Sequence, residues 1–524
     1  MNRSAARRSA LVAATLALPL LAVTLFAPVY QTNDDVAMRL LAEGKSAFLL
    51  LINVIPGEVL SLLYRVAPAM PWYDLMLGAL QTAAAGALLF VWSGPGSRDE
   101  WLWTTLFALF LLLPVFVNVQ FTVVAMTCAA AGIALLLHAT RRLQLVAGAL
   151  LFVAGSLIRF EGAMLIAIAG ALLAWPLWRR DAVVAACAAV VVAIVLFAIN
   201  VAVYRQSAGW DEFHEYHLHR THLSEFVAYE QITPAALRRL RDEVGWSGND
   251  LALLRDWFFA DREVYSLERV RRADAIFGNR PDLRRARELV STFLYDNRWV
   301  LLLLAAFALA RGARVYGVAA AATLVVLVAG VSYVLKPPPP HVTFPLLILL
   351  ATTLTIAARR WEQKPRAWRT VLAVVIAVWV AGPSTKALYR KSIERRATVA
   401  RVRRDVAALK ATGAQLFVLH GSAFPYESYW RPLRAEMAPF AFISLGGDTR
   451  MPPTQDLLRR YGITDLPSAI CSDPRLVLVA HPHTPPMLAT FLREHRHFDV
   501  RFERVLHAES FDAWRCAKAS AINS

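Results

Sequence analysis

Two adjacent carboxylates stand directly after the first apolar segment of the chain. The residues are Asn33, Asp34 and Asp35, and the apolar segment before them covers about residues 10–29. A carboxylate can accept the proton of a hydroxyl group as a general base, and two neighbouring carboxylates can hold Mg²⁺ or Mn²⁺ by their oxygens. A structural alternative is that Asn33 caps a helix over residues 34–42, with both aspartates in its first turn. The two interpretations are compatible, and both remain open at this point.

Other polar side chains gather at the ends of later apolar segments, where they are candidates for binding a substrate. A guanidinium or ammonium group there is suited to a phosphate. Several of these residues also have a purely structural alternative. Arg159 and Glu161 would then pair only with each other at a membrane interface. Lys336 would anchor a span next to a stiff proline run. The candidate substrate-binding residues are Asn33, Gln120, Arg159, Glu161, Arg220, Lys336 and His341.

A histidine-rich stretch covers residues 210–222. The pairs His214/His217 and His219/His222 have a spacing that can chelate a metal on one face of a helix. No closed set of four ligands accompanies them, so a solvated or interfacial helix is the favoured interpretation and no metal ligand is assigned.

The composition points to a membrane as the environment of these residues. Of the 524 residues, 57% are hydrophobic and 18% are charged, and the mean hydropathy is +0.44. A soluble protein of this size could not bury so much apolar surface. The formal net charge is +17, but much of the Lys and Arg stands in short clusters between apolar segments and no nucleic-acid motif is present.

The apolar segments predict a mainly α-helical, polytopic membrane protein, since a spanning helix needs about 20 apolar residues. The first segment also fits a signal peptide, but its length and the lack of a convincing cleavage site favour a retained anchor. We expect about eleven spans, near residues 10–29, 72–92, 101–117, 119–138, 143–158, 162–178, 182–204, 299–310, 315–335, 342–358 and 370–388.

The basic clusters orient these spans. They fall at Arg141–Arg142, Arg179–Arg180, Arg311 with Arg314, and residues 359–369. On the eleven-span count, all four lie on the same side as the N-terminus. The positive-inside rule makes that side cytoplasmic, so we predict a bacterial inner-membrane protein with an extracytoplasmic C-terminus.

Three regions are then expected outside the cytoplasm. Residues 30–71 include the apolar stretch Phe48–Val66, which Pro56-Gly57-Glu58 interrupts and which we expect to form helices at the membrane interface. Residues 205–298 form a polar, mostly helical loop. We therefore divide the chain into a transmembrane domain, 1–388, which includes both loops, and an extracytoplasmic domain, 389–524.

The tail alternates helical patterns with short strands, which predicts a small α/β domain. The expected strands are 415–419, 441–445, 475–480 and 500–506. In an oxidising compartment Cys471 and Cys516 either form a disulfide or remain two thiols. Cys128 and Cys187 lie inside apolar segments and are interpreted as small buried hydrophobic residues.

Several features that transporters and nucleotide-dependent enzymes usually have are absent from the sequence, and this limits the functions that we expect. The centres of the predicted spans hold essentially no charged residue, whereas ion-coupled transporters usually need one near the bilayer midplane. The sequence has no Gly-rich phosphate loop, no G-x-S-x-G motif and no H-E-x-x-H motif. Nucleotide-dependent chemistry in the cytoplasm therefore has no visible site.

The chain resembles the GT-C superfamily of integral-membrane glycosyltransferases, and more closely a group of bacterial membrane proteins of surface-glycan assembly. In the superfamily an acidic motif follows the first helix, where this chain has Asp34 and Asp35, and residues 159–162 resemble an R-x-E-G turn. Four shorter motifs carry the closer resemblance: T-N-D-D-V-x-M (32–38), L-L-Y-R (62–65), W-Y (72–73) and W-S-G-N-D-x-x-L-L-x-x-W (246–257).

The resemblance implies an inverting sugar transfer outside the cytoplasm from a polyprenyl-phosphate donor to a glycan or glycolipid acceptor. Asp34 or Asp35 would be the general base, with Asp34 preferred, and the cationic candidates would stabilise the departing phosphate. No cofactor is required, although a divalent metal remains an alternative. The rival functions are a non-catalytic glycan flippase, transport or assembly component, and a polymerase of glycan repeat units.

Overall fold

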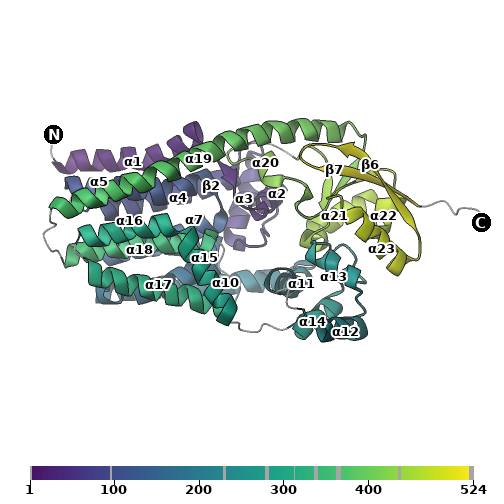
Figure 1. The fold of residues 1–524 in the computed structure, drawn as a ribbon, viewed down its shortest axis with the longest axis horizontal. Helices are drawn as coiled ribbons and strands as arrows, with labels where there is room; N and C mark the ends of the chain where they lie inside the picture. The colour runs from purple at the N-terminus through teal and green to yellow at the C-terminus, as the bar shows by residue number, and fades with distance from the viewer. Residues whose placement is uncertain are drawn as a thin grey trace, which may run out of the picture. The chain divides into compact units, whose positions relative to one another are not determined.

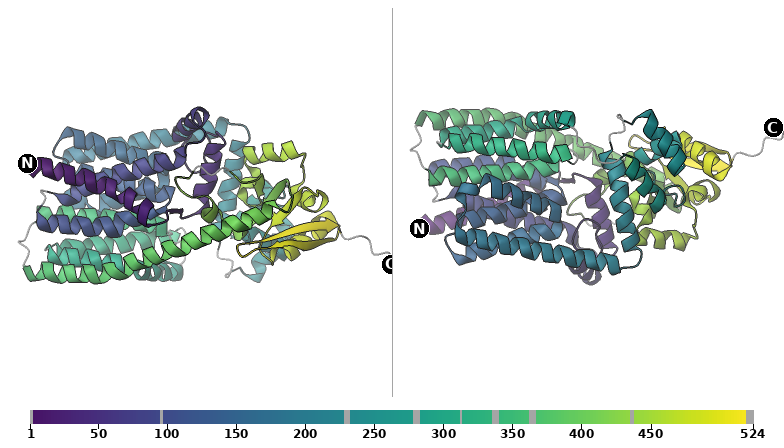
Figure 2. Two further views of the ribbon diagram at one scale, coloured as in Figure 1. Left: turned by 90° about the horizontal axis from the view of Figure 1, so that it is seen from above. Right: turned by 90° about the horizontal axis from the view of Figure 1, so that it is seen from below.

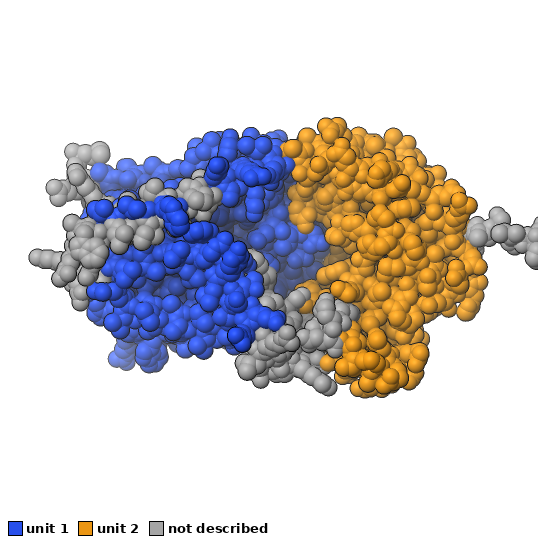
Figure 3. Space-filling view, in the orientation of Figure 1, with its two compact units in different colours: residues 1–201, 281–396, 430–435 blue, residues 202–280, 397–429, 436–524 orange. Residues whose placement is uncertain are grey.

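The structure is a computed structural model that describes residues 3–94, 97–227, 232–277, 283–311, 313–334, 340–361, 367–434 and 438–518. Residue contacts divide the chain into two units (Figure 3): unit 1 contains residues 1–201, 281–396 and 430–435, and unit 2 contains residues 202–280, 397–429 and 436–524. Most of the polar loop, up to residue 280, thus groups with the C-terminal tail, whereas residues 281–298 and a short piece of the tail, residues 430–435, group with the apolar helices.

Unit 1 consists mainly of helices, and its long helices lie side by side (Figures 1 and 2). A π-helical turn, Ala108–Leu112, joins α5 to α6, so that the two continue one another. The helices are α1 (Arg3–Leu25), α2 (Asn33–Glu43), α3 (Val54–Val66), α4 (Trp72–Ser93), α5 (Arg98–Phe107), α6 (Leu113–Val117), α7 (Phe121–His138), α8 (Arg142–Ile158), α9 (Phe160–Leu173), α10 (Arg180–Gln206), α15 (Leu283–Asp296), α16 (Arg298–Ala310), α17 (Arg314–Val334), α18 (Pro340–Arg360) and α19 (Ala367–Lys410), which continues into unit 2.

All eleven predicted apolar segments fall on helices of this structure. Within the described residues, seven helices are long and apolar enough to cross a membrane, or eight if the bent pair of α15 and α16, with an angle of 74°, is one span. Helices α8 and α9 are also apolar but shorter, with 17 and 14 residues, and are not counted among these seven. The chain is thus a multi-pass membrane protein by the length and composition of its helices, while the count of eleven spans stays a prediction.

Helix α7 forms the centre of unit 1, and it packs on α4, α8 and α18. Every residue from Phe121 to Leu137 is buried. Gly132 and Gly148 let α7 and α8 approach closely, because a Cβ on either would lie under 3 Å from the other's carbonyl oxygen. Small residues at such a contact are a common way to pack helices in a membrane.

The stretch expected to form interfacial helices contains the single helix α3. Pro56 and Gly57 lie in its first turn and Glu58 follows them, so these residues belong to the start of the helix and do not interrupt it. Gly57 lies against the carbonyl of Ala47, where a Cβ would come within 1.9 Å of the oxygen. One face of α3 exposes large apolar side chains, which suits a helix in a membrane interface: Ile55, Val59, Leu62 and Val66.

Unit 2 combines the tail with the polar loop. The loop is helical, as predicted, and the tail is α/β. Its helices are α11 (Trp210–Thr221), α12 (Pro234–Arg239), α13 (Gly248–Arg255), α14 (Leu267–Phe277), α20 (Tyr426–Tyr429), α21 (Pro452–Tyr461), α22 (Leu466–Ser472) and α23 (Thr484–Arg496). Its strands are β3 (Leu416–Leu419), β4 (Phe442–Ser444), β5 (Leu476–Val479), β6 (Val500–His507) and β7 (Asp512–Lys518).

The strands form one sheet in the order β4-β3-β5-β7-β6. The first three are parallel, and β7 joins β5 and β6 in antiparallel fashion. All four predicted strands are confirmed, but β7 was missed because its sequence, DAWRCAK, lacks a clear apolar alternation.

The cysteines separate into a bridge and two thiols. Cys471 on α22 and Cys516 on β7 form a disulfide, which settles the alternative left open by the sequence. Cys128 is buried as predicted. Cys187 is exposed on α10, so its interpretation as a buried residue was wrong: one side of this very apolar helix faces outward, where lipid replaces protein as its neighbour.

Candidate functional site

A two-residue sheet places the aspartates next to the start of α7. Strand β1 (Val29–Tyr30) pairs in parallel with β2 (Asn118–Val119), in the register Tyr30 to Val119. Because α2 begins shortly after β1 and α7 shortly after β2, the first turns of the two helices lie together. The carboxylate of Asp35 on α2 therefore meets the backbone N–H of Phe121, the first residue of the buried helix α7.

Asp35 is buried and its carboxylate is held at both oxygens. Oδ1 accepts hydrogen bonds from the Phe121 N–H at 3.0 Å and from the Tyr73 hydroxyl at 3.1 Å, and Oδ2 accepts one from Thr32 at 3.1 Å. Burial raises the pKa of Asp35 well above its usual value, and the neighbouring charge of Asp34 adds to that effect. The hydrogen bonds work in the opposite direction but do not offset the burial.

Asp34 has a different environment, because it is exposed, as is Asn33. Successive residues of a helix point about 100° apart, so the two carboxylates leave α2 in different directions. The structural alternative in which Asn33 caps this helix is not what the structure shows. Asn33 is the first helical residue, and Thr32 is the N-cap, with its hydroxyl bound to Asp35 and not to the helix backbone.

Arg39 lies one turn after the aspartates, and its side chain is fully buried. Its Nε donates to Glu43 at 2.7 Å, and its Nη1 lies 3.7 Å from Asp74 Oδ2. Burial works to lower the pKa of Arg39, but Tyr30, Asp74 and Glu43 together raise it above its usual value, so the guanidinium is charged.

The same guanidinium holds a distant piece of the chain. Its nitrogens donate to the carbonyls of Arg431, at 2.9 Å, and of Arg434, and the N–H of Leu433 donates to Asp74 at 2.9 Å. Sequence reasoning missed Arg39 and Asp74. The one available signal was the position of Asp74, directly after the Trp72-Tyr73 motif.

The turn between α8 and α9 lies near the same place. Arg159 Nε pairs with Glu161 at 3.1 Å, and the guanidinium lies over the ring of Phe121 at 5.9 Å. Phe121 is the residue whose N–H binds Asp35. His341 lies in the first turn of α18, a helix that packs on α7. The structure therefore brings Asp35 and Arg159 to the first turn of α7, through Phe121.

The remaining predicted site residues are Gln120, Lys336 and Arg220, of which Gln120 directly precedes α7. Gln120 is buried and caps α7, since its side chain accepts the Val123 N–H at 2.7 Å. Lys336 lies outside the described residues. Arg220 belongs to unit 2, where it is buried against Trp257 and Phe259.

Histidines of α11 and of the turn that follows it form side-chain hydrogen bonds within unit 2. His219 and His222 both contact Asp274, and His217 contacts Arg220 at 2.9 Å. Burial alone would raise the pKa of Asp274, but the two imidazoles hold it below its usual value.

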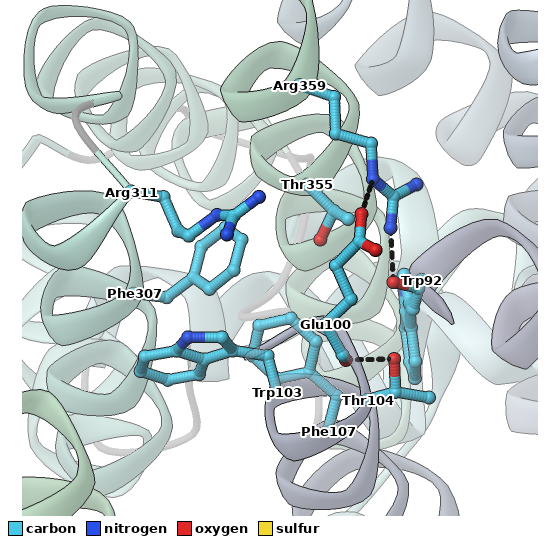
Figure 4. Close-up of a pocket in the computed structure, with 9 residues that line it drawn as sticks. All are labelled: Trp92, Glu100, Trp103, Thr104, Phe107, Phe307, Arg311, Thr355 and Arg359. Atoms are coloured by element: carbon cyan, nitrogen blue, oxygen red, sulfur yellow. Dashed lines mark hydrogen bonds and ion pairs between the residues drawn. The ribbon is translucent and has the colours of Figure 1, made fainter. Parts of the chain in front are cut away.

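A small pocket of unit 1 lies elsewhere, where α4 ends and α5 begins (Figure 4). Arg359 reaches into it, pairs with Glu100 at 2.9 Å and donates to the carbonyls of Val91 and Trp92. Arg359 therefore provides hydrogen-bond donors for backbone carbonyls in the last turn of α4, which have no partner within the helix. This contact is in addition to its predicted role as a cytoplasmic positive charge. The residues that line this pocket are Trp92, Glu100, Trp103, Thr104, Phe107, Phe307, Arg311, Thr355 and Arg359.

Comparisons with known proteins find similarity only among solved structures. No protein-family model matches the chain, and no curated protein matches it. It is similar to the crystal structure of ArnT from Cupriavidus metallidurans in the apo state, with 13% identity, a TM-score of 0.42 and 98% of each chain covered. It is similar also to ArnT from the same organism bound to undecaprenyl phosphate, with 13% identity, a TM-score of 0.40, and 97% of this chain and 98% of that chain covered.

Proposed function

We propose that this protein is a membrane glycosyltransferase of the GT-C type. It would transfer a sugar from a polyprenyl-phosphate donor to a hydroxyl of a glycan or glycolipid at the predicted extracytoplasmic surface. Two observations support the proposal: the resemblance of the sequence to the GT-C superfamily, and the positions of Asp34 and Asp35 on α2. It requires no cofactor; a Mg²⁺ or Mn²⁺ ion bound by the aspartates is the alternative.

The observation that carries the proposal is the contrast between the two aspartates. Asp35 is buried, hydrogen-bonded at both oxygens and shifted toward its neutral form, so it is suited to fix the start of α2. Asp34 is exposed beside it. Neighbouring carboxyl groups in unlike environments commonly divide the roles of an acid–base site. We therefore assign the general base to Asp34 and a positioning role to Asp35.

In the proposed reaction an acceptor hydroxyl oxygen attacks the anomeric carbon of the donor sugar. The bond from that carbon to the phosphate oxygen breaks, and polyprenyl phosphate leaves with the electron pair. The hydroxyl proton passes to Asp34, and the direct displacement inverts the anomeric centre.

The negative charge that develops on the leaving phosphate needs donors close by. Arg159 is our first candidate among the described residues, because its guanidinium lies over Phe121 in the first turn of α7. His341 is the second, because it lies in the first turn of α18, which packs on α7. Lys336 precedes His341 in the sequence and is the further candidate. Arg220 is less suited, since its side chain is buried in unit 2.

Sugar transfer from a defined donor tests the proposal. Undecaprenyl phosphate, the lipid found in one of the two similar ArnT structures, is the carrier to use. We expect Asp34→Asn to lower the rate by about 10²–10⁴-fold, the usual contribution of a general base, and Asp35→Asn to lower it less. Asp211→Asn is the matched control, because Asp211 is also an exposed aspartate in the first turn of a helix, α11.

Full activity in a folded Asp34→Asn protein would exclude the assignment of Asp34 as general base, and full activity in both Asp34→Asn and Asp35→Asn would exclude a general base at this pair. Movement of an intact lipid-linked glycan across the bilayer, with no sugar transferred, would favour the flippase alternative. Joining of whole repeat units would favour the polymerase.

A further inference from the structure

A strongly basic stretch of α19 lies where the last predicted span ends, and the proposed glycosyl transfer does not use it. Residues 386–396 hold five basic side chains and one acidic side chain, Glu394. On the predicted topology this stretch lies outside the cytoplasm, opposite the four basic clusters that orient the spans. The positive-inside rule therefore does not account for it. The basic residues are Lys386, Arg390, Lys391, Arg395 and Arg396.

Contacts with α1 place this stretch at the end of a membrane span. The candidate span Ala6–Leu25 ends where α19 passes it (Figure 1). The Arg396 guanidinium donates to the Leu25 carbonyl at 3.2 Å, and the Ala27 N–H donates to the Ser392 hydroxyl at 2.8 Å. All of these residues belong to unit 1. The basic stretch therefore lies at the depth where the apolar surface of α1 stops.

Lys386 and Arg390 continue a face of α19 that is apolar earlier in the helix. Val371, Val375 and Trp379 are each more than half exposed, and they recur at intervals of four residues. Seven residues make about two turns, so Lys386 lies on the same face as Trp379, and Arg390 follows one turn later. An apolar side chain exposed on a spanning helix has lipid as its neighbour. A lipid-facing stripe therefore leads directly into a basic one.

The opposite face of α19 is turned toward the interior of unit 1. Arg395 donates to Asn118 Oδ1 at 2.7 Å, in strand β2. Nine residues separate Arg395 from Lys386, and at about 100° per residue they lie on opposite sides of the helix. Lys386 thus leaves α19 away from β2, which leads into the first turn of α7 and the contact with Asp35. This basic face is therefore unsuited to hold a donor phosphate at the aspartates.

Phospholipid headgroups match the basic face in both charge and depth. A lysine or arginine at the edge of the apolar region can extend its long side chain to the level of the headgroups. Arg390 pairs with Glu394 at 3.0 Å, but its side chain is 80% exposed, so it still adds to the positive surface. An acidic soluble protein is a poorer fit, because it would not account for the lipid-facing stripe that leads into these charges.

We propose that the exposed basic face of α19 binds the headgroups of anionic phospholipids at the surface of the membrane. Lys386, Arg390 and Lys391 are the main contacts, and Arg396 lies beside them at the end of α1. The lipid bound here is not a substrate, so the proposal does not depend on sugar transfer.

Native mass spectrometry of the full-length protein in detergent tests the proposal, because it counts bound lipids and gives their affinities. Phosphatidylglycerol is the anionic probe and phosphatidylcholine is the neutral one. We expect phosphatidylglycerol to bind more tightly, by a margin that shrinks as salt is added. Lys386→Gln with Lys391→Gln should lower its affinity by about 25-fold, about fivefold for each charge, and leave phosphatidylcholine unchanged. Arg395 and Arg396 stay in place, since they hold β2 and α1.

Arg404→Gln with Lys410→Gln is the matched control. It removes two exposed positive charges from the same helix. At 1.5 Å per residue, Arg404 lies about 20 Å beyond Lys391, which is farther than the Debye length of about 10 Å at 0.1 M salt. This variant should bind phosphatidylglycerol as the wild type does. Thermal unfolding confirms that each variant is folded.

Any of three results would overturn the proposal. The first is equal affinity of the wild type for the two phospholipids. The second is unchanged affinity for phosphatidylglycerol after the loss of Lys386 and Lys391. The third is tighter binding of undecaprenyl phosphate than of phosphatidylglycerol, lost in the same variant, which would assign this face to the donor lipid. The rate of sugar transfer enters none of these measurements, so a failure of the proposed function would be seen separately.

Discussion

The buried carboxyl of Asp35 couples folding to pH. Its pKa is raised in the folded protein, so the neutral form is favoured there. The stability that this group contributes is fully present below the ordinary pKa of an aspartate, about 3.9, and is lost as the pH rises toward the folded pKa.

We predict that Asp35→Asn reduces this pH dependence, because an amide resembles the protonated carboxyl and can keep the hydrogen bonds of Phe121 and Tyr73. Asp35→Ala leaves those donors buried without an acceptor, at a cost of about 1–3 kcal/mol each. Thermal unfolding in detergent between pH 4 and 8 measures both effects. An Asp35→Asn protein as pH-dependent as the wild type would contradict this prediction.

Arg39 permits a second prediction about single residues. Replacing it with Met leaves Asp74 buried without its cationic partner and removes the donors to Arg431 and Arg434. Breaking such a buried pair costs about 3–5 kcal/mol. Chemical denaturation should show this loss, whereas Arg239→Met, which breaks the exposed pair with Glu243, should leave the midpoint unchanged. Equal effects of the two changes would show that the buried network contributes little.

At the scale of elements, the contact between α7 and α8 depends on glycine. A Cβ on Gly148 would lie 2.8 Å from the carbonyl oxygen of Gly132, and backbone cannot turn away as a side chain can. We predict that Gly148→Ala separates the helices and destabilises the protein by about 1–3 kcal/mol.

Gly78 in α4 is the matched control, because a Cβ there would meet nothing within 4 Å. Gly78→Ala should be neutral or should stabilise the protein by about 0.5–1 kcal/mol, since alanine is the better helix residue. The unfolding temperatures of the two variants compare them directly. A stable Gly148→Ala protein would mean that the helices can move apart at little cost.

At the scale of the whole molecule, the predicted topology places the two ends of the chain on opposite sides of the membrane. A phosphatase that is active only outside the cytoplasm should therefore be active when fused after Ser524 and inactive when fused before Met1. A cytoplasmic reporter should give the reverse pattern. Equal results at both ends would require an even number of spans and would move either the Asp34 site or the C-terminal tail to the other side.

Local patterns in the sequence were sufficient to predict the apolar helices and all strands of the unit 2 sheet except β7. Apolar runs of helical length identified the apolar helices, and short β-branched segments identified four strands of the sheet, because both signals lie within the element itself. The sequence also located the carboxylate pair and the Arg159 turn. It placed Pro56 and Gly57 inside an interruption, whereas in the structure they start α3, since Gly57 is needed against a carbonyl that only the folded chain brings near.

The roles of individual residues depended on the tertiary structure. Asp34 and Asp35 are indistinguishable in sequence, but the N–H of Phe121 and the hydroxyl of Tyr73 bury one and leave the other exposed. Arg39 reaches a segment almost 400 positions away, at Arg434. Such contacts carry no local signal, because they join residues whose separation in the chain is unrelated to their distance in the fold.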